Sequence, residues 1–105
     1  MICRQWKGAT SAADADAYGE YLERTGFSAY RQTPGHVRTL ALRRVQGERA
    51  EFVILSLWKS MDAVRAFAGE DVGRAVFYPE DDRFLVERDE HVTHYDVVYQ
   101  HPDHP

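Results

Sequence analysis

Cysteine is almost missing from this chain of 105 residues, since Cys3 is the only one. No disulfide can form within the chain, and the sequence suits a reducing compartment. Basic runs are missing as well: 13 Lys and Arg against 17 Asp and Glu leave a net charge of −4, which offers little to nucleic acids or anionic lipids. The longest apolar stretch, residues 52–58, is too short to span a bilayer, and the N-terminal residues lack the apolar core of a signal peptide. We therefore expect a soluble cytoplasmic domain with no membrane or nucleic-acid partner.

Motifs that hold nucleotides or metals are missing too. Neither GxGxxG nor GxxxxGK[ST] occurs. Four histidines lie near the C-terminus, but His91 and His94 are an odd number of residues apart and would point to opposite faces of a strand. His101 and His104 fall in a polar tail that contains two prolines. We expect no metal site and no cofactor.

The residues that are present predict one small α+β domain. Apolar residues make up 44% and charged residues 29%, which excludes wholesale disorder. Gln-Gly-Glu at 46–48 is typical of a hairpin turn, Ser60 of a helix N-cap, and Gly26 of a helix end. The expected strands are 2–7, 36–45, 50–59 and 91–99, and the expected helices are 12–24 and 61–68, with a further helical turn at 72–76. This order is that of a ferredoxin-like βαββαβ fold with a four-stranded antiparallel sheet, here residues 1–99, and 100–105 form a disordered tail.

Both faces of the third expected strand look buried. One face carries Phe52, Ile54, Ser56 and Trp58, and the other carries Val53, Leu55, Leu57 and Lys59. Helices cover only one face of such a sheet, so the second apolar face predicts that another copy of the chain covers it, in a homodimer. The alternative is a central strand that is apolar on both sides for its own packing.

Four segments resemble the antibiotic biosynthesis monooxygenase family of dimeric α/β barrels. They follow a Pro-Gly pair at 34–35 and read FVILSLWKS (52–60), MDAVRAFAGED (61–71), AVFYPEDDRFL (75–85) and HVTHYDVV (91–98). Their order and spacing cover nearly the whole chain. The resemblance implies a homodimer of ferredoxin-like subunits whose sheets pack face to face, with a pocket in each subunit between the sheet and its helices.

The family includes cofactor-independent oxygenases of aromatic polyketides and haem-degrading enzymes. The haem-degrading branch is expected to carry an Asn on the first strand, a Trp in the helix after the third strand and a His about ten residues further on. Phe67 and Phe77 stand at the last two of these positions, and residues 2–7 contain no Asn. The resemblance therefore does not favour haem degradation.

His94 is the leading ionisable candidate, because a histidine near its ordinary pKa can take a proton at neutral pH. Asp96, two residues on, would share its face of the strand and could orient it. Tyr78 would donate to a phenolate or carbonyl oxygen, and Arg38 could stabilise an oxyanion. The structural alternatives are a half-buried strand histidine, a loop-anchoring tyrosine and a surface arginine. The acidic run 80–82 is typical of a solvated loop.

Aromatic residues supply the expected substrate-binding set. Trp58 ends the third strand, where a side chain could line a pocket mouth, and Trp6 could approach it from the first strand. Phe67, Phe77 and Asp96 complete the set. Flat aromatic walls suit an aromatic ligand, although aromatic residues in a small domain also serve as core.

Three functions fit these residues. The first is a cofactor-independent monooxygenase in secondary metabolism that acts with molecular oxygen on a small aromatic or polyketide-like substrate, whose own electrons reduce the oxygen. The second is a polyketide cyclase or isomerase on the same scaffold. The third is a non-catalytic dimeric module for ligand binding or stress response. We favour the first.

Overall fold

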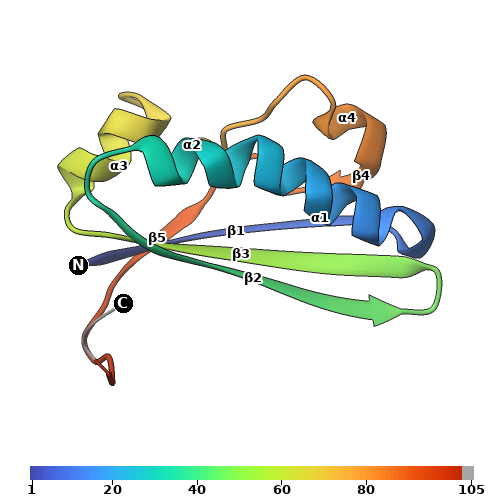
Figure 1. The fold of residues 1–105 in the computed structure, drawn as a ribbon, viewed down its shortest axis with the longest axis horizontal. Helices are drawn as coiled ribbons and strands as arrows, with labels where there is room; N and C mark the ends of the chain where they lie inside the picture. The colour runs from blue at the N-terminus through green and yellow to red at the C-terminus, as the bar shows by residue number, and fades with distance from the viewer. Residues whose placement is uncertain (103–105) are drawn as a thin grey trace.

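The helices of the computed structural model lie on one face of an antiparallel sheet and leave the other face uncovered (Figure 1). The structure describes residues 1–102. The strands are β1 (Ile2–Ser11), β2 (His36–Gln46), β3 (Arg49–Trp58), β4 (Leu85–Arg88) and β5 (Thr93–Asp96). The α-helices are α1 (Ala15–Arg24), α2 (Gly26–Gln32), α3 (Met61–Ala68) and α4 (Asp81–Phe84), and a 3₁₀ turn spans Ala12–Asp14. The predicted α+β, ferredoxin-like fold is confirmed.

The central strand is β1, in the order β2-β3-β1-β4, with β5 also paired to β1. The β5 strand pairs with residues 2–5 of β1, and β4 pairs with residues 8–10. We expected one last strand at 91–99, and these bounds were wrong. Two short strands, β4 and β5, share the edge beside β1, and β5 spans only Thr93–Asp96. Between them the backbone turns to another partner: Glu90 accepts from Ala75 N at 2.9 Å, and Val92 donates to Gly73 O at 2.8 Å.

The helices partly follow the expected pattern. Ser60 caps α3 as predicted, since its Oγ accepts from Ala63 N at 3.2 Å, and Gly69 ends that helix at a φ of 87°. The further helical turn at 72–76 was wrong, because this backbone pairs with residues 90–92 instead. Gly26 does not end the helical segment: the break falls at Thr25, whose φ and ψ are −114° and −91°, and α2 follows at once.

The two faces of the sheet differ in cover. On β3 the side chains under the helices are fully buried, and those on the opposite face are half-buried. The uncovered face is nevertheless apolar, with Leu40, Leu42 and Tyr95 being 45%, 48% and 51% exposed beside Leu55 and Leu57. The fold therefore separates a filled helix side from an open apolar side.

Within the described chain, residues 1–102, no helix is long and apolar enough to cross a membrane. The predicted tail begins at Gln100, in a stretch without helix or strand, and its residues 103–105 lie outside the described residues.

Gly8 provides a test of this packing. It lies two residues after Trp6 on the helix side of β1, and a Cβ at Gly8 would overlap the Trp6 ring. Gly8→Ala should destabilise the protein by about 1–3 kcal/mol because the ring must move. Gly19→Ala is the matched control: its Cβ meets nothing, and alanine in α1 should stabilise by about 0.5–1 kcal/mol. Thermal unfolding measures both, and equal Tm values would contradict the packing described.

Candidate functional site

A cavity of about 40 Å³ lies between the helix side of the sheet, helices α1 and α2, and residues 69–80, the cover segment between α3 and α4. It has room for about three or four water molecules, at roughly 10–15 Å³ each. The aromatic side chains that line it are Trp6, Tyr18, Phe27, Tyr30, Phe67, Phe77 and Tyr78. The expected pocket between sheet and helices is thus present, as a small aromatic cavity.

The polar feature of this cavity is Arg4, on central strand β1. Arg4 is only 3% exposed, and its guanidinium lies 5.8 Å from the centroid of the Phe67 ring. It donates from Nη1 to Val72 O at 2.6 Å and from Nη2 to Arg74 O at 3.0 Å, both in the cover segment. Across residues 1–102 it forms no ion pair with a carboxylate. The site therefore holds a buried cation that only neutral acceptors satisfy, and burial lowers its pKa.

His94, on β5, lies opposite Arg4 on the neighbouring strand. Its Nε2 is 3.1 Å from Arg4 Nη1. Because a guanidinium can only donate, Nε2 accepts, which puts the ring proton on Nδ1 and leaves the imidazole neutral. Burial, and secondly the charge of Arg4, lower the pKa of His94. Asp96 is exposed, and no hydrogen bond joins it to His94 in the described chain. We expected Asp96 to orient the His94 ring, but the side chain that contacts this ring is Arg4.

Two other polar side chains lie on this part of the helix side, Tyr30 and Ser56. Burial raises the pKa of Tyr30 to about 12, with Arg4 and Ser56 acting in the opposite direction. Ser56 accepts from Trp58 Nε1 at 2.9 Å. Trp58 is fully buried and stacks on Phe67 at a centroid distance of 5.6 Å, so it supports the cavity wall without lining it.

The structure brings together four of the expected site residues: Trp6, Phe67, Phe77 and Tyr78 all line the cavity. Trp6 and Phe77 meet edge to face at 6.3 Å. Arg38 does not join them. It pairs with Leu57 across the sheet and so points to the uncovered face, away from the cavity. The expected grouping of Arg38 with His94 and Tyr78 is corrected accordingly.

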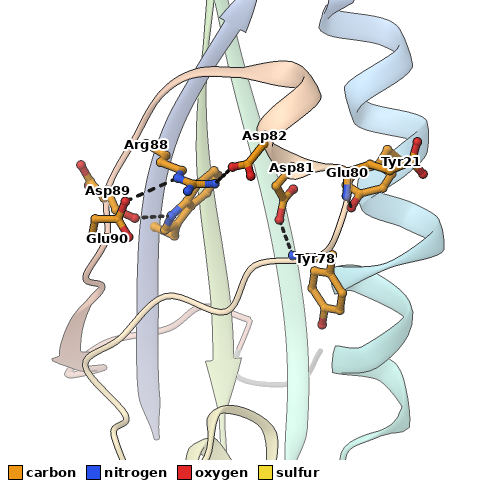
Figure 2. Close-up of polar contacts among 9 residues, drawn as sticks. Tyr21, Tyr78, Glu80, Asp81, Asp82, Arg88, Asp89 and Glu90 are labelled. Atoms are coloured by element: carbon orange, nitrogen blue, oxygen red, sulfur yellow. Dashed lines mark hydrogen bonds and ion pairs between the residues drawn. The ribbon is translucent and has the colours of Figure 1, made fainter.

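Sequence reasoning missed Asp81, which is 4% exposed and lines the cavity. Its Oδ2 accepts from Tyr78 N at 2.6 Å, whereas the neighbouring Asp82 turns the other way to Arg88 (Figure 2). The interpretation of 80–82 as a solvated loop holds for Glu80 and Asp82, which are exposed, and is wrong for Asp81. Burial raises the pKa of Asp81.

A sequence signal existed for Arg4 but not for Asp81. Arg4 lies between Ile2 and Trp6 on an alternating strand, which places it on their face. Asp81 begins the four-residue helix α4, which is too short for a periodicity that would assign the side of its first residue. Within residues 1–102, no group of three or more His, Cys, Asp or Glu side chains could hold a metal ion, and His104 lies outside that range.

The neutral state of His94 predicts an acid-dependent loss of stability. Since its folded pKa is lower than the unfolded value of about 6.5, the unfolded state binds more protons, and stability falls as pH drops from there to the folded pKa. His94→Gln should lose less Tm than the wild type between pH 7.5 and pH 5.5. His91→Gln, at an exposed histidine, should behave as the wild type. An unchanged acid response in His94→Gln would contradict the neutral assignment.

No protein-family model and no curated protein matches the chain. Solved structures do match over nearly its whole length. One, named as an antibiotic biosynthesis monooxygenase from Bacillus cereus, aligns with a TM-score of 0.67 at 14% identity, covering 94% of each chain. Another of that name, from Nitrosomonas europaea, aligns at 0.63 and 17% identity over 94% of this chain and all of the other. The heme-degrader MhuD from Mycobacterium tuberculosis, with two hemes in its active site, aligns at 0.53 and 20% identity over 95% and 98%. The chain therefore has the fold of the antibiotic biosynthesis monooxygenase structures.

Proposed function

We propose that this protein is a cofactor-independent monooxygenase that acts on an acidic aromatic or polyketide-like small molecule in secondary metabolism, as a cytoplasmic homodimer. The observation that carries the proposal is the Arg4 guanidinium, which is buried in an aromatic cavity and has no carboxylate partner among residues 1–102. Such a site favours a flat ligand that becomes an anion, since the cation gains a charged acceptor in a dry environment. The likeness to the fold of monooxygenase structures supports the reaction type, and the single cysteine supports a reducing compartment.

The chemistry needs no electrons from the protein. A substrate CH₂ group next to electron-rich rings loses a proton, and the carbanion or phenolate so formed reduces molecular oxygen. The overall change is CH₂ + O₂ → C=O + H₂O, in which the substrate carbon supplies all the electrons. Arg4 would hold the anion, and the Tyr78 hydroxyl would donate to the substrate oxygen.

The geometry assigns His94 a positioning role in this proposal. To accept a proton at Nε2, His94 would first have to give up its hydrogen bond with Arg4. Its neutral imidazole instead orients the guanidinium that binds the anion. Arg38 takes no part in the proposed chemistry, because it points to the other face of the sheet.

Haem degradation is not proposed, although MhuD shares the fold. Haem iron is held by an axial protein ligand, most often histidine. In the described chain no histidine lines the cavity, and Phe67 and Phe77 occupy the positions that differ from the haem-degrading pattern. These residues do not fit a haem group.

Substrate binding tests the role of Arg4. Arg4→Gln should weaken binding of the anionic probe 2-naphthoate by at least tenfold, because a hydrogen bond to a charged group contributes about 1.5–3 kcal/mol. Arg4→Lys, which keeps the charge, should retain part of the affinity. Arg38→Gln removes the same charge on the opposite face and should bind as the wild type. Quenching of tryptophan fluorescence reports binding, and equal affinity in Arg4→Gln would reject the anion site.

Oxygen uptake separates the proposal from its alternatives. The wild type should consume one O₂ per molecule of 1,8-dihydroxyanthrone. A cyclase or isomerase would turn its substrate over under argon, and a binding module would show affinity without turnover.

The uncovered sheet face supports the dimer. We expect light scattering to give about 24 kDa, twice the chain mass of 12.1 kDa. Leu42→Arg, in the apolar face, should give the monomer mass. Val45→Arg should leave the dimer intact, because Val45 is 53% exposed but lies on the helix side of the same strand. A wild-type mass near 12 kDa would reject this part of the proposal.

A further inference from the structure

The acidic loop 80–82 contains one carboxylate that differs from its neighbours. Asp81 is 4% exposed and lines the same cavity as Arg4, whereas the Asp82 side chain is 81% exposed. One oxygen of Asp81, Oδ2, accepts from Tyr78 N. In the described chain Oδ1 has no hydrogen-bond donor among the protein groups. A residue that lines the cavity thus has one carboxylate oxygen that no described protein group binds.

Few charges offset the burial of this carboxylate. Its charge acts on the phenols of Tyr18, Tyr21 and Tyr78, and the charged side chains that act on it are Arg88 and Asp82. Arg88 is engaged elsewhere: its Nη1 binds Asp82 at 2.7 Å and its Nε lies 3.4 Å from Glu90, as Figure 2 shows. Burial outweighs the hydrogen bond from Tyr78 N and the attraction of Arg88, so the pKa of Asp81 is raised and its basicity with it.

We propose that Asp81 is the proton acceptor of the site, a catalytic residue that removes the proton from the substrate held by Arg4. This inference rests on the proposed function and names the base in it. The proton moves from the acidic CH₂ or OH of the substrate to Oδ1 of Asp81, and the electron pair stays on the substrate. The resulting anion is held by the Arg4 guanidinium. When oxygen has reacted, the proton leaves with the product water.

The alternatives for the base are fewer than the sequence suggests. The Nε2 lone pair of His94 is directed at Arg4. Tyr30 and Tyr78 have raised pKa values and are protonated at neutral pH. Among the described residues that line the cavity, Asp81 is the only carboxylate. A cation and a carboxylate in one small aromatic cavity form a complete set for removing a proton and stabilising the anion.

The competing role for Asp81 is purely structural, as the acceptor that holds the turn at Tyr78. Asp81→Asn separates the two roles, because the amide oxygen can still accept from Tyr78 N while basicity is lost. Its Tm at pH 7 should equal or exceed that of the wild type, since a buried charge is removed. Turnover of 1,8-dihydroxyanthrone should fall by 10²-fold or more. Asp82→Asn, the same change one residue on and outside the cavity, should keep full turnover.

Anaerobic spectroscopy isolates the proton transfer from the oxygen chemistry. Under argon at pH 7, the wild type mixed with the anthrone should develop the absorbance of the anthrone anion, and Asp81→Asn should bind it in the neutral form. In the wild type this absorbance should grow as pH rises through the raised pKa of Asp81, and that step should be missing from Asp81→Asn. Formate should restore anion formation in Asp81→Ala, even where that variant is less stable.

The outcomes distinguish the two proposals. Anion formation or turnover in Asp81→Asn equal to the wild type would overturn the role of Asp81 as base and leave the monooxygenase proposal standing. An Asp81-dependent anion without oxygen uptake would confirm the base and reject the oxygenase. A wild type that binds neither the anthrone nor 2-naphthoate would overturn both.

Discussion

The buried guanidinium of Arg4 is the constraint on which the rest of the site depends. It extends from the central strand, and its hydrogen bonds reach two backbone carbonyls of the cover segment and the imidazole of β5. A charge that is 3% exposed is stable only when its donors are satisfied, so these acceptors must stay in place as long as the cavity is closed. Arg4 therefore holds the cover segment next to β1, sets the tautomer of His94 and forms the polar end of the cavity.

Asp81 supplies the opposite charge without neutralising Arg4. In the described chain the two side chains form no ion pair, although both line the cavity. A direct pair would lower the pKa of the carboxylate and occupy the guanidinium, which would remove both the proposed base and the proposed anion site. Aromatic side chains make up most of the lining of the cavity that holds both groups. In the proposed mechanism, the separation of the two charges would keep each group reactive at a cost in stability, which is common in active sites.

The fold was predictable from the sequence because strand alternation and helix caps are local signals. The faces of β1 and β3, the hairpin at Gly47 and the cap at Ser60 are confirmed. Errors arose where long-range pairing decides the conformation: residues 72–76 pair with 90–92 instead of forming a helix, and β4 takes up half of the edge beside β1. The aromatic lining followed from composition and family likeness. Arg38 was misplaced because only sheet register shows which face it occupies. Asp81 was missed because its burial comes from a loop folded over helix α1.

The small size of the closed cavity bears on how a ligand enters. A volume of about 40 Å³ cannot hold an aromatic ring, so the proposed substrate would bind only after part of the cavity wall had moved. A movement of the cover segment would break the bonds from the guanidinium to Val72 O and Arg74 O. A neutral ligand offers only equivalent acceptors in exchange, whereas an anion forms charge-assisted bonds about twice as strong. In the proposed function, the loss of these bonds would be offset by an anionic ligand and not by a neutral one, so the charge of Arg4 would favour molecules that can carry a negative charge.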